Sequence, residues 1–153
     1  HRVPRHDTSS TKPGKPEENE AADPEQPGGQ ALAIAERLEK IKQGGLVGLG
    51  GAAFPTYRKL QLPPDAKVDT LLINGSECEP YLTCDYRLML EESDKVVLGA
   101  WTIAKMVGVK QCLIGIEDNK ADAADALRES ITRLDIASMQ PGVEMQVVMT
   151  ETK

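Results

Sequence analysis

Apolar runs alternate with helix-forming segments in the second half of the chain, and this order constrains the fold more than any other feature. Residues 68–73, 111–116 and 143–149 are rich in Val, Ile, Leu and Met, as buried strands are. Between them, residues 96–107 and 123–134 place apolar side chains at helical spacing. Strands that are joined through helices run parallel, with right-handed crossovers. The sequence therefore predicts an α/β fold with a parallel βαβαβ sheet.

Helix boundaries are indicated by capping residues. Ser93 is expected to be the N-cap of the first crossover helix, and Gly108 is a signal for its C-terminal end. Apolar residues at helical spacing between residues 34 and 41 predict an earlier helix, which the glycines at 44 and 45 should end.

The N-terminal segment has the composition of a linker. Residues 1–29 are rich in Pro, Glu and Gly and contain almost no large apolar side chain. Such a segment buries too little surface to offset the loss of chain entropy. We therefore expect a disordered linker over residues 1–29 and an ordered domain over residues 30–153.

Charge and cysteine usage exclude several functions. The net charge of −6 disfavours a nucleic-acid partner, and no apolar run is long enough for a direct membrane span. The three cysteines lack CxxC spacing, so this segment cannot supply the four ligands of an iron–sulfur cluster. No metal site is predicted.

Polar residues follow the predicted strands where a ligand is expected. Residues 74–80 come after the first strand and residues 117–119 after the second. In open α/β sheets, ligands bind beyond the carboxyl ends of the strands. Glu77 and Glu79 could accept hydrogen bonds from sugar hydroxyls, and Asn74 could donate or accept. The alternative is a solvated acidic turn.

A glycine-rich segment, residues 48–54, precedes the first strand. Glycines let backbone amides approach an anion closely, and Arg58 or Lys59 could add positive charge against a phosphate. The segment formally matches GxGxxG/A, but it follows a helix and Pro55 comes directly after it, unlike the dinucleotide fingerprint. A plain connection between helix and strand remains the alternative.

Together these motifs resemble a known family. Residues 48–59 resemble the GxGGAGFPTxxK loop of flavoprotein subunits that oxidise NADH, and residues 74–91 resemble the NGAECEPYLTxDxRLMLE signature of the C subunit of Rnf-type ion-translocating electron transport complexes. Residues 115–120 resemble a further stretch of the same Rnf protein. The flavin subunit of the respiratory NADH dehydrogenase has a more distant version. The resemblance implies a Rossmann-like three-layer domain with a glycine-rich flavin loop before the first strand, of which this chain holds the N-terminal part.

The resemblance also implies particular ligand contacts. The residues expected to contact FMN are Gly48, Gly50, Gly51, Lys59, Asn74 and Glu77. Those expected to contact NADH are Phe54, by stacking, and Glu79, by a hydrogen bond. No catalytic side chain is expected, because the flavin performs the redox chemistry.

Departures from the family pattern occur within the motifs. Ala53 stands where the loop usually has glycine; if that position is left-handed, Ala53 is strained by roughly 1 kcal/mol or more. Leu49 and Ser76 stand where the respiratory relatives have Arg and Asp. Both changes remove polar groups that could contact flavin or NADH.

The implied function is electron transfer from or to NADH through FMN, in an NADH-dependent flavoprotein oxidoreductase subunit of an ion-translocating complex. The partners would be other subunits, the place would be the cytoplasmic face of the membrane, and 4Fe-4S clusters would lie in the part after Lys153. We expect the isolated chain to hold FMN weakly or not at all. The alternatives are a soluble cobalamin-reductase-like flavoprotein and a non-catalytic assembly module with a decayed flavin site.

Overall fold

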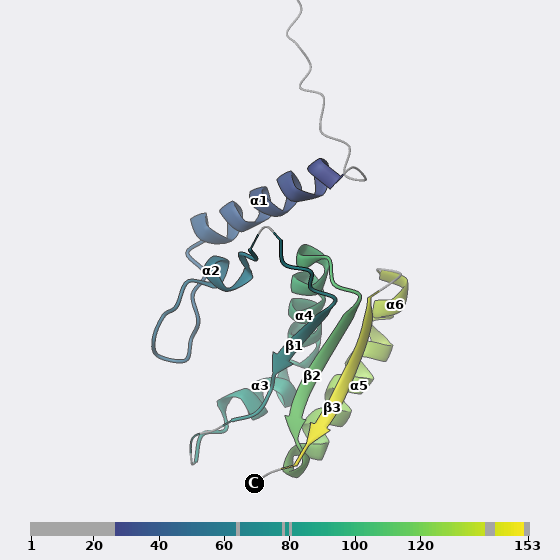
Figure 1. The fold of residues 1–153 in the computed structure, drawn as a ribbon. Helices are drawn as coiled ribbons and strands as arrows, with labels where there is room; N and C mark the ends of the chain where they lie inside the picture. The colour runs from purple at the N-terminus through teal and green to yellow at the C-terminus, as the bar shows by residue number, and fades with distance from the viewer. Residues whose placement is uncertain (1–26, 64, 78, 80, 140–142, 152–153) are drawn as a thin grey trace, which may run out of the picture.

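The computed structural model of the chain describes residues 27–63, 65–77, 79, 81–139 and 143–151. Helices and strands alternate after a helical N-terminal part (Figure 1). In chain order the elements are α1 (Pro27–Gln43), α2 (Thr56–Leu60), β1 (Thr70–Asn74), α3 (Cys84–Glu91), α4 (Ser93–Val107), β2 (Gln111–Glu117), η1 (Asp118–Lys120), α5 (Ala121–Arg133), α6 (Ile136–Met139) and β3 (Glu144–Thr150).

The strands form a parallel sheet in the order β1-β2-β3, which confirms the predicted βαβαβ fold. Thr70 pairs with Gln111, and Gln111 pairs with Glu144, so the three strands begin in line. Their carboxyl ends therefore meet at one edge, where β1 ends at Asn74 and β2 at Glu117.

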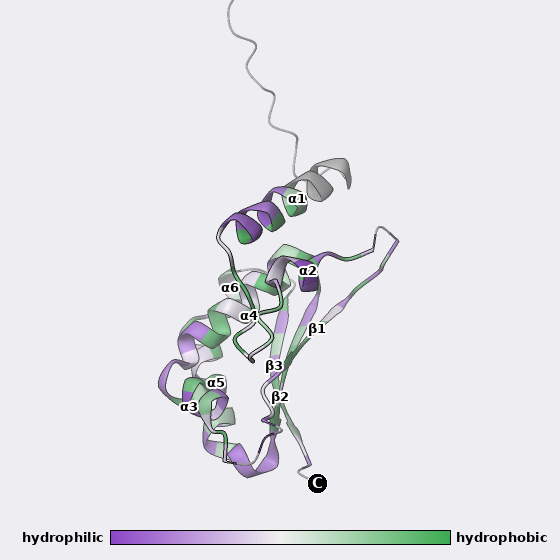
Figure 2. Cartoon of the chain, turned by 90° about the vertical axis from the view of Figure 1, so that its left-hand side faces the viewer, coloured by the Kyte–Doolittle hydropathy of each residue, from purple (hydrophilic) through white to green (hydrophobic). Residues whose placement is uncertain are grey.

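The helices pack on one face of this sheet. Both crossovers step in the same direction across the sheet, and right-handed crossovers then place their helices on the same side. Figure 2 shows α3, α4 and α5 together on that side. Cys112, Ile114 and Ile116 of β2 point toward these helices and are fully buried.

Among the described residues, nothing forms on the opposite face of the sheet the third layer that the resemblance implied. Leu72 of β1 is 73% exposed and Val148 of β3 is 39% exposed. Within the described residues the domain is therefore two-layered. A sheet whose strand order never reverses receives crossover helices on one face alone, which accounts for the difference.

The N-terminal helix begins earlier than expected. Residues 27–29 form the first turn of α1, although the Pro-Gly-Gly composition of this stretch predicts a linker. Proline suits the first helical turn because its missing amide hydrogen has no partner there. The helix ends as predicted, with Gly45 in a left-handed conformation at φ 64°. The rest of the predicted linker, residues 1–26, lies outside the described residues.

The segment between β1 and α4 contains a helix that the sequence did not reveal. Helix α3 covers Cys84–Glu91, and Glu92 separates it from α4 with a non-helical φ of −131°. The prediction that Ser93 is the N-cap of α4 is wrong, because Ser93 is its first helical residue. At the other end of α4, Gly108 is left-handed at φ 80° and its amide donates to the Ala104 carbonyl, as predicted.

Ser93 instead takes part in a polar cluster that joins α4 to α5. The hydroxyl of Ser130, which is fully buried, lies 2.8 Å from Ser93 Oγ and 2.7 Å from Asp94 Oδ1. Arg133 Nη2 donates to the same Asp94 oxygen at 2.5 Å. Hydrogen bonds from Ser130 and Arg133 lower the pKa of Asp94.

Among the described residues, no helix combines the length and the apolar character needed to cross a membrane.

Candidate functional site

The glycine-rich segment forms a loop whose neck is closed by backbone contacts. Val47 and Pro55 make an isolated antiparallel bridge, and the Gly48 amide donates to the Phe54 carbonyl at 2.8 Å. In Figure 1 the loop, in slate blue, lies below α1 and α2 on the β1 side of the sheet. Its tip points toward the end of the molecule at which β1 stops.

The tip of the loop is open. A Cβ atom added to Gly50 or Gly51 would meet no heavy atom within 4 Å. Gly51 has φ +94°, a conformation that side chains with a Cβ rarely adopt. Within the described part of the chain, the amides of Gly50 and Gly51 donate to no protein acceptor. Two adjacent free amides in an open turn are suited to an anion such as a phosphate.

The amide of Gly48, unlike those of Gly50 and Gly51, is not available to an anion. It serves the neck of the loop, so it is not free to donate to a phosphate. A Cβ atom on Gly48 would instead lie 3.4 Å from the Lys59 Nζ atom.

Lys59 brings positive charge to the same loop. Its Nζ atom lies 6.0 Å from the centroid of the Phe54 ring, at the outer limit of a cation–π contact. It forms no ion pair with any residue that the structure describes. Gly48, Phe54 and Lys59, all predicted ligand contacts, are therefore grouped around one side of the loop.

Ala53 adopts the left-handed conformation, with φ 48°. The strain that we expected for a left-handed residue at this position is therefore present. Leu49 at the tip is 96% exposed, so the apolar side chain in place of the relatives' Arg contacts almost nothing in the domain.

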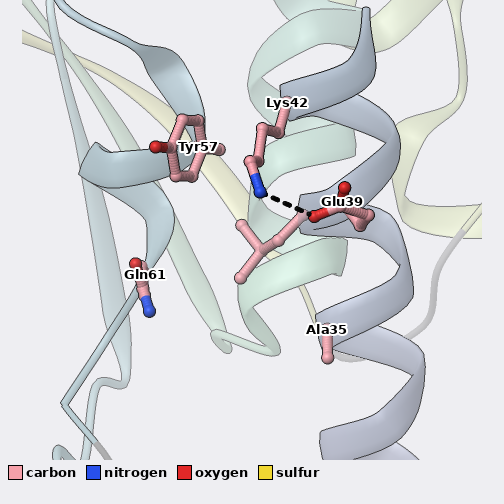
Figure 3. Close-up of a pocket in the computed structure, with 6 residues that line it drawn as sticks. Ala35, Glu39, Lys42, Tyr57 and Gln61 are labelled. Carbon is pink, nitrogen blue, oxygen red and sulfur yellow. Dashed lines mark hydrogen bonds and ion pairs between the residues drawn. The ribbon is translucent and has the colours of Figure 1, made fainter.

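A cavity of about 230 Å³ lies between α1 and α2 but is separate from the predicted contacts (Figure 3). Lys42 donates to Glu39 at 3.3 Å and its Nζ atom lies 5.9 Å from the Tyr57 ring centroid. The cavity is lined by Ala35, Leu38, Glu39, Lys42, Tyr57 and Gln61. Its volume is below the roughly 300 Å³ of small ligand sites, and we interpret it as a packing gap where α2 docks on α1.

The second group of predicted contacts begins where β1 ends. Gly75 is buried, and its amide donates to the Gly115 carbonyl of β2 at 2.8 Å. A Cβ atom on Gly75 would lie 2.9 Å from that carbonyl oxygen and 3.1 Å from Met89 Sδ. Glycine is therefore required here, because the chain leaves β1 pressed against β2. No local pattern predicts this contact, since it depends on the partner strand.

Asn74 shapes the turn that follows. Its Oδ1 atom accepts a hydrogen bond from the Ser76 amide at 3.1 Å. Its side-chain NH₂ group has no partner among the described residues. Asn74 can therefore donate to a ligand through this group, and its oxygen already accepts one of the two hydrogen bonds that it can accept.

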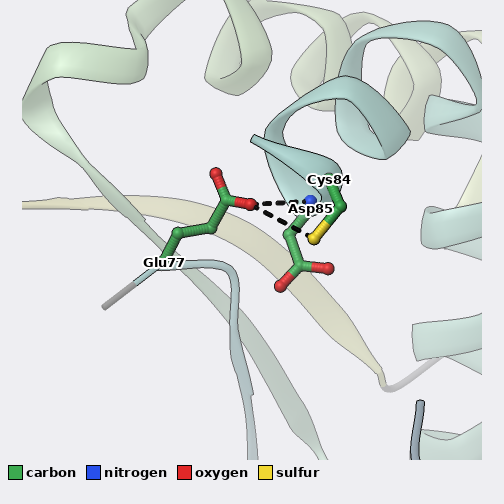
Figure 4. Close-up of side chains that lie close together, drawn as sticks. All are labelled: Glu77, Cys84 and Asp85. Carbon is green, nitrogen blue, oxygen red and sulfur yellow. Dashed lines mark hydrogen bonds between the residues drawn. The ribbon is translucent and has the colours of Figure 1, made fainter. Parts of the chain in front are cut away.

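Glu77 anchors the N-terminus of α3 (Figure 4). Its Oε1 atom accepts from the Asp85 amide at 2.9 Å and lies 3.6 Å from Cys84 Sγ. Its Oε2 atom is buried and has no hydrogen-bond partner in the described part of the chain. The three side chains place ligand atoms within 4.8 Å of one another, but capping of α3 already explains their proximity. The free Oε2 atom leaves an acceptor for a ligand hydroxyl or N–H group.

Glu79 lies in an exposed turn beyond Glu77. Its carbonyl accepts from the Leu82 amide at 3.3 Å, and the intervening Tyr81 is fully exposed with φ 66°. The Glu79 carboxylate is accessible but contacts no other predicted residue. Among the described residues, no hydrogen bond or ion pair joins this group of residues to the glycine loop.

A hydrogen bond joins the side chains of α3 and α5. Tyr86 donates its hydroxyl hydrogen to Asp122 Oδ2 at 2.5 Å, and Lys120 Nζ lies 4.4 Å from the Tyr86 ring centroid. The hydrogen bond raises the pKa of Tyr86 and lowers that of Asp122. These residues were not anticipated, because α3 itself was not predicted.

Known proteins have similar sequences over most of the length of this chain. Residues 41–153 match the family model described as the Nuo51 FMN-binding domain. The chain is 48% identical over 122 residues to the C subunit of the proton-translocating ferredoxin:NAD(+) oxidoreductase complex of Clostridium ljungdahlii, covering 80% of this chain and 25% of the relative. It is 46% identical over 126 residues to the C subunit of the Na(+)-translocating ferredoxin:NAD(+) oxidoreductase complex of Acetobacterium woodii, covering 77% and 28%. The chain thus spans about a quarter of the length of these curated relatives.

A solved structure shares the fold. An NAD+-reducing [NiFe]-hydrogenase in the air-oxidised state superposes with a TM-score of 0.64 at 24% sequence identity, covering 82% of this chain and 22% of that chain. At this level of identity the similarity concerns the architecture alone.

Proposed function

Because the chain belongs to the Nuo51 FMN-binding domain family, we propose that it is the FMN-binding part of an electron-transferring subunit in an ion-translocating oxidoreductase complex of the Rnf type. NADH is the proposed electron donor or acceptor at this subunit. Other subunits of the complex are the proposed partners, at the cytoplasmic face of the membrane. The 4Fe-4S clusters that exchange single electrons are proposed to lie outside this segment.

The observation that carries the proposal is the set of unused polar groups at the two loops. Gly50 and Gly51 offer free amides, Lys59 offers a cation without an ion pair, and Glu77 offers a buried acceptor without a donor, all with respect to the described residues. A buried acceptor without a partner is unfavourable by about 1–3 kcal/mol, so a ligand donor would stabilise it. A phosphorylated, hydroxyl-bearing ligand matches all of these groups.

FMN is such a ligand, and when bound it supplies the step between two-electron and one-electron transfer. We assign its phosphate to the amides of Gly50 and Gly51 and to the Lys59 ammonium. Its ribityl or ring donors and acceptors are assigned to Glu77 Oε2 and to the side-chain NH₂ group of Asn74. The protein binds and orients the cofactor, and no side chain is required as a general acid or base.

We assign the nicotinamide contacts to Phe54 in the glycine-rich loop and to Glu79 in the turn beyond Glu77. Phe54 is 50% exposed and presents an aromatic face for stacking, and Glu79 presents an accessible carboxylate. Glu79→Gln should weaken the use of NADH more than it reduces FMN content. An equal loss of both would contradict this role.

The assignment of the loop is tested by flavin retention in the intact polypeptide. Lys59→Ala combined with Gly51→Val removes the cation and blocks the open turn, so the purified protein should lose its bound FMN while the far-UV circular dichroism is unchanged. Lys40→Ala, an exposed lysine on α1, is the matched control and should retain flavin. An unchanged FMN content in the double variant would show that the loop does not bind the phosphate.

A non-catalytic assembly module remains the second candidate. The strained Ala53 and the exposed Leu49 are the observations that favour it, because Ala53 stands at a usual glycine position and Leu49 replaces the Arg of the respiratory relatives. A colourless intact protein that does not take up added FMN would establish this alternative. A soluble cobalamin-reductase-like flavoprotein would take up FMN but would not copurify with membrane subunits.

A further inference from the structure

The backbone amide of Gly48 is already occupied within the loop. The amide donates to the Phe54 carbonyl at 2.8 Å, and it closes the neck of the loop together with the Val47–Pro55 bridge. Any residue except proline could make this backbone contact. No positive φ accounts for glycine at this position either.

The missing side chain of Gly48 is what distinguishes the site. The space that a Cβ atom would enter is bounded by Lys59 Nζ at 3.4 Å and by the Phe54 carbonyl oxygen at 3.7 Å. The ammonium therefore lies next to the position of the missing Cβ atom, and its Nζ atom is 6.0 Å from the centroid of the Phe54 ring. An alanine methyl group would just touch the ammonium. A valine would add two further carbons, each about 1.5 Å from Cβ, at a position where Cβ alone is already in van der Waals contact with the ammonium.

We propose that Gly48 is a positioning residue that acts through Lys59, by leaving room for the ammonium to lie over the neck of the loop beside Phe54. This inference rests on the proposed function, in which Lys59 contacts the FMN phosphate. It assigns to Gly48 a steric role toward the lysine in place of an amide contact with the cofactor. No carboxylate of the described residues holds Lys59, so the shape of the loop is what positions its charge.

The test compares FMN with riboflavin, which lacks the phosphate, in the intact polypeptide. Dissociation constants are measured by flavin fluorescence quenching for the wild type, Gly48→Val, Lys59→Met and the double variant. Each single substitution should weaken FMN binding by about 10- to 100-fold, the range of one charge-assisted contact. Riboflavin binding should change little. The double variant should bind FMN no more weakly than Lys59→Met alone.

Several results would overturn the inference. An equal loss of FMN and riboflavin binding in Gly48→Val would show that Gly48 maintains the loop and not the lysine. Additive losses in the double variant would show that Gly48 acts independently of Lys59. If the wild type bound neither flavin, the proposed function would fail and this inference with it, which is distinguishable from the other two outcomes.

A second measurement needs no flavin and no substitution at Gly48. The ε-methylene protons of Lys59 should show a ring-current shift in the NMR spectrum of the wild type, and Phe54→Leu should abolish it. The fluorescence of Trp101, the single tryptophan of the chain, reports whether the variant is folded. Absence of the shift in the wild type would contradict the position of the ammonium.

Discussion

Replacement of Ala53 by glycine should stabilise the protein. Ala53 is exposed and has φ 48°, so its Cβ atom makes no buried contact but is held in the left-handed region. An L-residue in this region is strained by about 1–2 kcal/mol. Glycine removes the strain but has greater freedom in the unfolded chain, which offsets about 0.4–1 kcal/mol. The expected net gain in the free energy of unfolding is therefore about 0.8 kcal/mol, within a range of roughly 0–1.6 kcal/mol.

Ala52→Gly is a control of the same chemistry one residue away. Ala52 is also exposed, but it has no positive φ, so only the entropic penalty applies. It should lose about 0.4–1 kcal/mol. Urea unfolding followed by Trp101 fluorescence would give both changes, and thermal unfolding should shift in opposite directions by roughly 2–5 °C.

Opposite signs for the two variants are the decisive result. If Ala53→Gly destabilises the protein as much as Ala52→Gly does, then Ala53 is not in a left-handed conformation in solution. The strain that we assign to the loop would then be absent, and the interpretation of Ala53 as a departure from a glycine position would be wrong.

Other predictions concern the sheet edge, the α4–α5 joint and the thiols. Gly75→Ala should destabilise the protein by roughly 1–3 kcal/mol, because the added methyl group meets a backbone oxygen. Gly99→Ala, in an open position on α4, should stabilise it slightly. Equal changes of the two variants in urea unfolding would contradict the prediction for Gly75. The lowered pKa of Asp94 contributes stability above its unfolded pKa of about 3.9, and this stability is lost as pH falls through the folded pKa. In Asp94→Asn, the free energy of unfolding should therefore fall less steeply as the pH is lowered. A plot of stability against pH that runs parallel to that of the wild type would refute this. Burial raises the pKa of Cys112 to about 11, so at pH 8 iodoacetamide should label the exposed Cys84 and spare Cys112; peptide mapping that found equal labelling would contradict the buried thiol. Because the buried thiolate is disfavoured, the folded protein should lose stability as pH rises from the unfolded thiol pKa toward 11.

The regular part of the fold could be predicted because its pattern is local. Each strand carries an apolar run and each crossover helix an apolar stripe, so β1, β2, β3, α4 and α5 lie within a few residues of their expected places. Gly108 ends α4 as its chemistry requires. These features depend on neighbouring residues, which a single sequence displays.

The missed features depend on contacts between distant residues. Helix α3 is short, and its capping acceptor is the side chain of Glu77, which lies eight residues before Asp85 and is not a standard N-cap signal. The need for glycine at position 75 comes from Gly115 of another strand. The use of the Gly48 amide in the neck of the loop required the three-dimensional position of Phe54. The sequence identified the candidate site residues, whereas the structure showed which of their polar groups are free.

The most direct measurement is a crystal structure of the intact polypeptide with FMN bound. We predict that the phosphate accepts hydrogen bonds from the amides of Gly50 and Gly51 and from Lys59 Nζ, and that a flavin group donates a hydrogen bond to Glu77 Oε2. A phosphate bound elsewhere, with Glu77 Oε2 still lacking a partner, would contradict it.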